Sequence, residues 1–272
     1  MSVITLTTDF GLRDPDLGYL KSLILQVLPN ANLIDISHAS LPFDPDEAIY
    51  IVKNALQGFP KGTIHWVGID SETHIDNRPI LIVNHQHFYL ANDNGIITAA
   101  LSGTDFKVFA LPFSKPGVFM EAHLEVLRRL SKGVMPDDFA QITQDYKTLK
   151  LSKPLLRYDD KTQKVALVTP KVIYNDNYGN AIFNLSRDEF EKWRDGRKFS
   201  IKLRHYEINE ISQTYWPEHQ TGVVTTAGTM YARFNHFGYL EIFIYKSNRK
   251  SGGADTLLSL HKNQIVNIVF ES

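Results

Sequence analysis

The first half of the chain alternates short apolar runs with longer segments in which apolar residues recur at helical spacing. The apolar runs, which predict strands, cover residues 3–6, 32–36, 63–69, 80–84 and 87–91. The segments with helical spacing lie at about 18–28, 44–56 and 121–130. Strands that alternate with helices are typical of a parallel sheet with crossover helices. The sequence therefore predicts an α/β domain with a mainly parallel sheet over residues 1–150.

The pattern changes after a polar, irregular stretch at residues 136–164. Strand-like runs then follow one another with few helices between them, at residues 165–169, 172–175, 181–184, 199–203, 221–226, 230–234, 239–245 and 265–270. Many short strands in succession indicate a barrel or a sandwich. We therefore expect a second, β-rich domain over residues 165–272, with residues 151–164 as the linker.

The composition narrows the class of protein. The chain has 272 residues, a formal net charge of −1 and no cysteine, so a disulfide, a thiolate nucleophile and a cysteine metal site are excluded. Basic residues form no dense block of the kind that binds nucleic acid, and no stretch approaches the roughly 20 apolar residues of a membrane span. With no recognisable secretory signal, we expect a cytoplasmic protein without nucleic-acid or membrane partners.

Three carboxylates follow predicted strands of the first domain. Asp9 lies in the segment Thr7-Thr8-Asp9-Phe10-Gly11, Asp14 comes shortly after it, and Asp70 follows the run at 63–69. Because parallel strands end at the same edge of a sheet, we expect these side chains at one edge. Such carboxylates can accept hydrogen bonds from ribose hydroxyls, hold an ammonium group or bind a cation such as Mg²⁺. The alternative is that each caps a helix or a turn.

Two polar turns between predicted strands are further candidates, Asp176-Asn177-Tyr178-Gly179-Asn180 and Asn235-His236-Phe237-Gly238-Tyr239. Their Gly and Asn residues can simply supply positive φ, which is the alternative to ligand binding. The histidines show no zinc-site spacing, and His123 is interpreted as a structural residue of a helix. Neither a Gly-rich phosphate loop nor a Gly-x-Ser-x-Gly motif is present, which disfavours phosphoryl transfer and triad hydrolysis.

Taken together and in order, several segments resemble the S-adenosylmethionine (SAM) hydroxide adenosyltransferase family. Its members are also called SAM hydrolases, and its relatives include fluorinase and chlorinase enzymes. The matching segments are Thr7-Thr8-Asp9-Phe10-Gly11 with Asp14, Asp35-Ile36-Ser37-His38 with Pro42-Phe43-Asp44, Phe59-Pro60-Lys61-Gly62-Thr63-Ile64-His65, Asp93-Asn94-Gly95, the turn from Asp176 to Asn180 with Asn184, and Asn235 with Gly238-Tyr239-Leu240-Glu241-Ile242. They cover both halves of the chain.

The resemblance implies an N-terminal α/β domain that binds an adenosyl ligand, a C-terminal all-β barrel domain and a homotrimer. In relatives, the ligand lies between the N-terminal domain of one subunit and the C-terminal domain of its neighbour. The implied reaction is attack of water or hydroxide on the 5′ carbon of SAM, giving adenosine and methionine. SAM is then the substrate, and no cofactor is expected.

The resemblance also assigns roles to individual residues of the pocket. Asp9 is expected at the ribose hydroxyls, and Asp14, Asn235 and His236 at the amino-acid end. Phe43 is expected to form an aromatic wall. Tyr178 and Asn180 are expected at the adenine, with Asp176 in the same turn.

The chain departs from the family where the attacking water is held. Hydrolases of the family use an Asp, an Arg and a His for this purpose. Asp70 is kept, Asn77 occupies the place of the first of two paired arginines, and Arg78 matches the second. The segment that should carry the His, residues 113–117, contains none. A rearranged water site is therefore expected, with Asp70 at its centre and Arg78 or His74 as substitutes for the missing groups.

Halide chemistry is disfavoured, because Asp70 places a negative charge where a halide would lie, although Ser71 and Thr73 offer hydrogen-bond donors. Three hypotheses stay open: a SAM hydrolase with a rearranged water site, an adenosyl-binding module without turnover, and a metal-assisted hydrolase that uses Asp9, Asp14 and Asp70.

Overall fold

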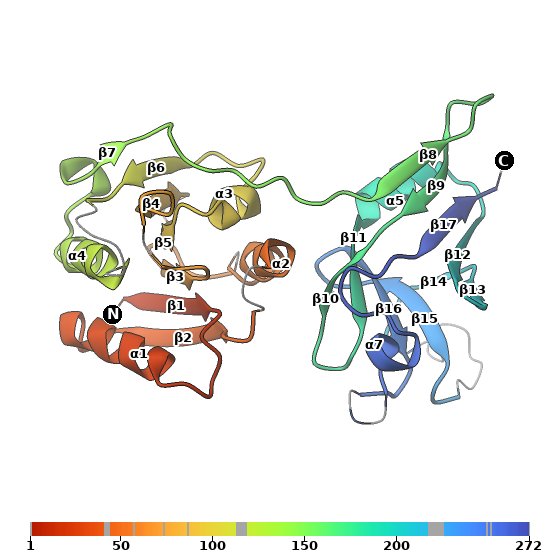
Figure 1. Cartoon of the computed structure of the whole chain (residues 1–272), viewed down its shortest axis with the longest axis horizontal. Helices are drawn as coiled ribbons and strands as arrows, with labels where there is room; N and C mark the ends of the chain where they lie inside the picture. The colour runs from red at the N-terminus through yellow and green to blue at the C-terminus, as the bar shows by residue number, and fades with distance from the viewer. Residues whose placement is uncertain are drawn as a thin grey trace. The chain divides into compact units, whose positions relative to one another are not determined.

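The computed structural model describes residues 2–40, 44–56, 58–72, 74–85, 87–112, 119–216, 226–248, 250 and 252–271. The chain divides into two compact units, Met1–Leu151 and Ser152–Ser272, which Figure 1 colours from red to green and from green to blue. Buried apolar side chains form separate clusters in each unit. None of the described helices is long and apolar enough to cross a membrane.

A seven-stranded mixed sheet, in the order β2-β1-β3-β5-β4-β6-β7, forms the centre of the N-terminal unit. Its strands are β1 (Val3–Thr8), β2 (Asn32–Ser37), β3 (Ile64–Gly68), β4 (Pro79–Asn84), β5 (His87–Asn92), β6 (Lys107–Ala110) and β7 (Gln141–Ile142). Strands β2, β1, β3 and β5 are parallel, whereas β4, β6 and β7 pair antiparallel with their neighbours. The parallel strands make up the larger part of the sheet and end at a common edge.

Helices cover both faces of this sheet (Figure 1). On one face lie α1 (Asp16–Val27) and α4 (Phe119–Ser131), and on the other lie α2 (Pro45–Ala55) and α3 (Ile96–Ala100). Side chains alternate between the two faces. Trp66 of β3 therefore packs in the apolar core beneath α1 and α4, and Val67 packs in the core beneath α2 and α3. Because both faces are covered, the strands appear in the sequence as continuous apolar runs.

The C-terminal unit contains two five-stranded sheets, β10-β11-β16-β15-β14 and β13-β12-β17-β9-β8. The strands are β8 (Leu155–Tyr158), β9 (Val165–Thr169), β10 (Val172–Asn175), β11 (Ala181–Ser186), β12 (Phe199–Leu203), β13 (Tyr206–Ile208), β14 (Ile211–Ser212), β15 (Met230–Phe234), β16 (Tyr239–Ile244) and β17 (Asn267–Phe270). Neighbouring strands are antiparallel except β14 and β15. The short helices α5 (Arg187–Arg194) and α7 (Ala254–Leu257) pack beside them.

Apolar side chains from both sheets form a single core in this unit. An isolated bridge between Lys171 and Ile265 joins the start of β10 to the segment before β17. Among the described residues the two sheets share no strand, so closure into a barrel stays a prediction. Strand β8 lies within the segment 151–164 that the sequence predicts as a linker. The predicted strand at 221–226 falls, up to residue 225, outside the described residues.

Candidate functional site

Two of the three candidate aspartates are joined by a hydrogen bond at the carboxyl edge of the parallel strands. Strands β1 and β3 are neighbours, with Thr8 opposite Gly68, so that Asp9 and Asp70 follow at the same edge. The backbone N–H of Asp70 donates to Asp9 Oδ2 at 3.0 Å. Asp14 is exposed, and among the described residues no hydrogen bond or ion pair joins it to either carboxylate.

The loop after Asp9 is fixed by buried polar contacts to the neighbouring strand end. Gly11 has a φ of +71° and donates its N–H to the carbonyl of His38 at 2.7 Å. The ring of His38 is buried, and its Nδ1 lies 2.8 Å from Thr8 Oγ1. The backbone around Asp9 is therefore attached to the residue that follows β2 as well as to the end of β3.

Asn77, which takes the place of a family arginine, is turned into the protein. Its side chain is only 3% exposed, and its Nδ2 donates to the carbonyls of Asp70 and Glu72 at 2.8 and 2.9 Å. These bonds close the loop that carries Asp70. The side-chain amide of Asn77 thus acts on the backbone of the loop.

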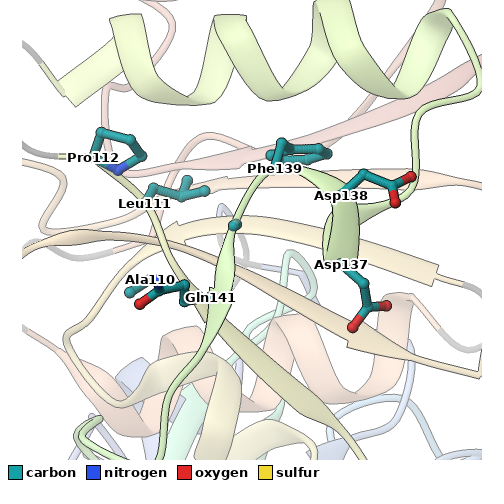
Figure 2. Close-up of a pocket in the computed structure, with 8 residues that line it drawn as sticks. Ala110, Leu111, Pro112, Asp137, Asp138, Phe139 and Gln141 are labelled. Carbon is teal, nitrogen blue, oxygen red and sulfur yellow. The ribbon is translucent and has the colours of Figure 1, made fainter.

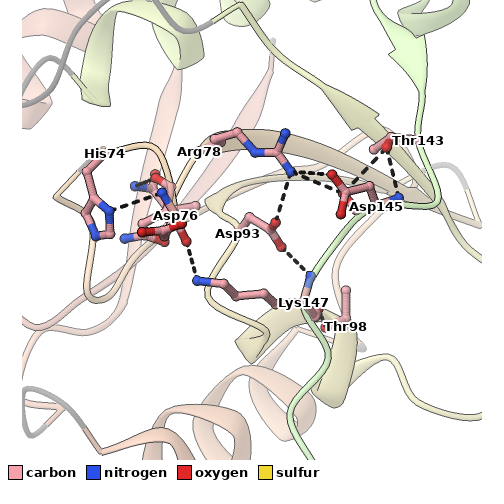
Figure 3. Close-up of polar contacts among 10 residues, drawn as sticks. His74, Asp76, Arg78, Asp93, Thr98, Thr143, Asp145 and Lys147 are labelled. Atoms are coloured by element: carbon pink, nitrogen blue, oxygen red, sulfur yellow. Dashed lines mark hydrogen bonds and ion pairs between the residues drawn. The ribbon is translucent and has the colours of Figure 1, made fainter.

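Arg78 is held by two carboxylates, as Figure 3 shows. Its guanidinium lies 3.1 Å from Asp145 Oδ2 and 3.9 Å from Asp93 Oδ2. Asp93 also accepts the backbone N–H of Lys147 at 2.7 Å, and the Lys147 ammonium group donates to the carbonyl of Asp76. Residues 143–150 therefore form a strap across the loops that follow β3 and β5.

His74, the other candidate substitute, is exposed, and its Nδ1 accepts the backbone N–H of Asp76 at 3.2 Å. Among the described residues neither His74 nor Arg78 contacts the side chain of Asp70. The sequence also predicts roles for Phe43, Thr73 and residues 113–117. These residues lie outside the described part of the chain.

The candidate turn from Asp176 to Asn180, in the C-terminal unit, is held by the side chain of Asp176. Asp176 Oδ1 accepts the backbone N–H groups of Tyr178 and Asn180 at 2.8 and 2.9 Å, and Oδ2 accepts the Asn180 side-chain amide at 2.9 Å. Gly179 has a φ of +80°, and a Cβ there would lie 2.7 Å from Asp255 Oδ1. The turn buries Asn180 and leaves Tyr178 58% exposed, so its aromatic ring is open to contact.

The second turn is organised in the same way. Asn235 Oδ1 accepts the backbone N–H groups of Phe237 and Tyr239 at 3.0 and 3.1 Å. Asn235 is buried, whereas the ring of His236 is exposed and packs on Phe237 with centroids 3.7 Å apart. In both turns a side-chain oxygen of the first residue, Asp176 or Asn235, holds the backbone, and the exposed ring of Tyr178 or His236 is left for other contacts.

A polar cluster beside the turn from Asp176 to Asn180 was not predicted from the sequence. Glu241 on β16 is almost fully buried, and its Oε1 lies 3.2 Å from Nη2 of Arg233 on β15. Burial raises the pKa of Glu241, and the positive charge of Arg233 opposes that effect. The Arg233 guanidinium lies 4.7 Å from the ring of Tyr215, whose hydroxyl interacts with the Asn180 side chain. A charged residue inside the apolar run Tyr239–Ile244 was the available signal.

An open cavity of about 520 Å³ lies where β6 ends and β7 begins (Figure 2). It is lined by Ala110, Leu111, Pro112, Asp137, Asp138, Phe139, Ala140 and Gln141, which include none of the predicted site residues. In the described part of the chain, no three His, Cys, Asp or Glu side chains converge in the manner of metal ligands.

A mostly parallel α/β unit with two hydrogen-bonded aspartates at its sheet edge, followed by a unit of mainly antiparallel sheets, defines a two-domain protein with an α/β part and a β part. The chain belongs to the SAM hydroxide adenosyltransferase family. The family's N-terminal domain matches residues 4–123, and its C-terminal domain matches residues 170–267.

Individual relatives agree with this assignment. The chain is 26% identical over 264 residues to an (R)-S-adenosyl-L-methionine hydrolase of Methanocaldococcus jannaschii, which covers 91% of this chain and 90% of the relative. It is 22% identical over 234 residues to a fluorinase of Nocardia brasiliensis, covering 74% and 76% of the two chains. An uncharacterised conserved protein of Thermotoga maritima has the same fold, with a TM-score of 0.78, 21% identity, and coverage of 99% of this chain and 100% of that chain.

Proposed function

We propose that this protein hydrolyses SAM to adenosine and methionine by attack of water on the 5′ carbon. Family membership supports an adenosyl substrate, and the relatives named as SAM hydrolases support water as the nucleophile. The observation that supports the proposal is the hydrogen bond from the Asp70 backbone N–H to Asp9 Oδ2, which joins the two aspartates at the carboxyl edge of the sheet. A site there can bind ribose with one carboxylate and water with the other.

In this proposal Asp9 accepts hydrogen bonds from the ribose hydroxyls, and Asp70 orients the attacking water. The water oxygen forms a bond to C5′, and the electron pair of the C5′–S bond leaves with sulfur as the neutral thioether of methionine. The water proton passes to Asp70 and then to solvent. Because sulfonium is already a good leaving group, the protein mainly has to position and desolvate the nucleophile.

The remaining family roles complete the proposed site. Tyr178 and Asn180, with Asp176 in their turn, are assigned to the adenine side. Asp14, Asn235 and His236 are assigned to the amino-acid end and Phe43 to the pocket wall, and Thr73 is proposed as a further ligand-binding residue that can donate a hydrogen bond. We also propose the trimeric assembly, the closed C-terminal barrel and the cytoplasmic location that the resemblance and the sequence predict.

A direct test incubates the pure protein with SAM and measures adenosine and methionine by chromatography. Production above the spontaneous rate, lost in Asp9→Ala and strongly reduced in Asp70→Asn, is the expected result. Adenosine binding, measured by calorimetry on the same samples, should disappear in Asp9→Ala and persist in Asp70→Asn. Unchanged affinity in Asp9→Ala would remove the pocket assignment, and unchanged turnover in Asp70→Asn would remove Asp70 from the reaction.

The second candidate function is an adenosyl-binding protein without turnover. It is favoured by the engagement of Arg78 with Asp93 and Asp145 and by the inward orientation of Asn77, since both positions then serve the loop structure. Binding of adenosine without product formation would establish it. A chelator added to the same assay tests the metal-assisted alternative, because only that reaction would stop.

A further inference from the structure

Four consecutive backbone carbonyls of the loop after β3 each accept a hydrogen bond from an asparagine side chain. The bonds run from Asn94 Nδ2 to the Ile69 carbonyl (2.8 Å), from Asn77 Nδ2 to the Asp70 and Glu72 carbonyls (2.8 and 2.9 Å), and from Asn92 Nδ2 to the Ser71 carbonyl (3.0 Å). We call Asn77, Asn92 and Asn94 the asparagine clamp. Its members come from the loop before β4, the end of β5 and the turn after β5.

The clamp is buried and internally connected. Asn77 is 3% exposed and Asn92 is 2% exposed, and Asn94 is half-buried. Asn92 Nδ2 also donates to the Asn77 carbonyl at 3.1 Å, which joins the two residues to each other. Amide groups at these positions supply donors to the loop without adding a charge beside Asp70.

The direction of these bonds determines where the Asp70 amide points. In a planar trans peptide, a C=O group and the following N–H point in opposite directions. The Ile69 carbonyl points to Asn94, and the N–H of Asp70 accordingly points the other way, to Asp9 Oδ2. Asp70 itself has a φ of +44°, a conformation that a non-glycine residue keeps only when its surroundings hold it.

We propose that Asn77, Asn92 and Asn94 are positioning residues that fix the backbone of Asp70 and so set the distance between the Asp9 and Asp70 carboxylates. The inference rests on the proposed function and adds to it: the position of a family arginine now carries an amide that orients the loop. Loss of one clamp amide should release the loop and move Asp70 relative to Asp9.

The test compares Asn77→Ala, Asn92→Ala and Asn94→Ala with a matched control, Asn84→Ala. Asn84 is also a buried asparagine, and its Nδ2 donates to the Asp105 carbonyl at 2.7 Å and to Thr104 Oγ1 at 3.1 Å. It is the last residue of β4, whereas Asn77 lies just before the first. A general loss of stability would affect the control and the clamp variants alike.

The first readout is hydrogen exchange of the Asp70 amide, followed by NMR in the full chain. We expect exchange to become about tenfold faster in the clamp variants and to stay near the original rate in Asn84→Ala. The second readout is the kinetics of SAM hydrolysis. Because small displacements of reacting groups are costly, kcat should fall about tenfold or more in the clamp variants, with a much smaller change in KM.

The two readouts separate the failure of this inference from the failure of the proposed function. If the unmodified protein releases no adenosine, the proposed function fails, and the exchange rates alone decide whether the clamp fixes Asp70. Unchanged exchange in all the clamp variants overturns the inference. Faster exchange with unchanged kcat in an active protein also overturns it. If Asn77→Ala does not fold, Asn77→Leu, which keeps about the same size, adds no charge and removes the donor, takes its place.

Discussion

The buried histidines with a lowered pKa lie in the N-terminal unit, and the buried carboxylate with a raised pKa lies in the C-terminal unit. The N-terminal unit buries His65 and His123 among apolar residues, and burial lowers the pKa of His65 to about 3 and that of His123 to about 4. The C-terminal unit buries Glu241, and burial raises the pKa of that carboxyl. Acid therefore introduces charge into the first unit and removes charge from the second.

Neutral hydrogen bonds hold the histidine of the N-terminal sheet. His65 Nδ1 lies 2.8 Å from Thr5 Oγ1, its Nε2 lies 3.2 Å from His87 Nδ1, and its ring packs 4.8 Å from the ring of Tyr89. A proton on His65 would add a charge to this dry environment, next to a second histidine. The contacts are arranged for the neutral imidazole.

An ion pair and aromatic rings hold the carboxylate of the C-terminal sheet. Arg233 lies between Glu241 and the ring of Tyr215, which stacks on Phe243 at 4.6 Å. A planar guanidinium suits this position because it can pair with a carboxylate and lie over a ring at the same time. The difference between the units teaches that burial alone does not set the response to pH, since the sign depends on which form is charged.

The largest expected effect comes from breaking the buried ion pair. Arg233→Ala leaves Glu241 buried without its cation, and such a loss typically costs about 3–5 kcal/mol of stability. The free energy of unfolding, measured in urea at neutral pH, should fall by that amount. The double variant Arg233→Met with Glu241→Leu is the control and should recover much of the loss. A decrease below about 1 kcal/mol would show that water already compensates the pair.

A smaller effect is expected from acid acting on the N-terminal unit. Because the pKa of His65 is lowered from 6.5 to about 3, the unfolded chain binds a proton first as the pH falls below 6.5. The contribution of this histidine to stability is therefore fully present above pH 6.5. As the pH falls from 6.5 to 5, the free energy of unfolding should decrease by about 2 kcal/mol for one such histidine. His65→Phe should flatten this slope in urea unfolding curves. An unaltered slope would mean that the ring is protonated in the folded protein.

The carboxylate of the C-terminal unit should respond with the opposite sign. The pKa of Glu241 is raised by burial, so the unfolded chain loses its proton first as the pH rises above 4.5. Its contribution to stability is complete below that value and is lost as the pH rises through the raised pKa. The slope should be shallower than that of His65, because Arg233 opposes the effect of burial. Glu241→Gln should remove this pH dependence of the free energy of unfolding. If the dependence is still present in the same series of urea unfolding curves, it does not come from Glu241.

The smallest effect is expected at the exposed ion pair of the N-terminal unit. Arg78 is 39% exposed and Asp145 is 87% exposed, and the buried Asp93, 3.9 Å from Arg78, keeps its hydrogen bond from the Lys147 N–H, so Arg78→Ala should cost no more than about 1 kcal/mol. If Arg78 serves the strap alone, SAM turnover should also stay within about a factor of three. A loss of turnover of a hundredfold at unchanged stability would place Arg78 at the attacking water after all.

The spacing of apolar residues was sufficient to predict the main helices and strands of both units. Apolar runs predicted β9 and β10 with the observed bounds, and helical spacing predicted α1 and α4 within two residues at each end. Each of these elements packs against the same core along its whole length. The pattern of apolar residues in the sequence therefore agrees with the packing in the folded protein.

Elements without an amphipathic pattern were missed for physical reasons. Helix α3 is buried on every side and short, so its sequence has no polar face to reveal a helical period. Helix α5 is largely polar, although the capping box of Ser186 and Glu189 offered a signal for its start. The clamp asparagines could not be predicted, because Asn92 and Asn94 meet carbonyls more than twenty residues away that only the tertiary fold brings near.

The strap also decides where the N-terminal unit can be separated from the rest of the chain. The sheet ends at Ile142, but Asp145 and Lys147 lie beyond it and contact Arg78 and Asp93. Beyond them, Leu149 packs so closely on Gly95 that a Cβ at Gly95 would lie 2.8 Å from Leu149 Cγ. A truncated protein that stops with the last strand would lose these partners and uncover the turn that holds Asn94. A fragment that keeps these contacts therefore has to extend to Leu151, past the last strand of its own sheet.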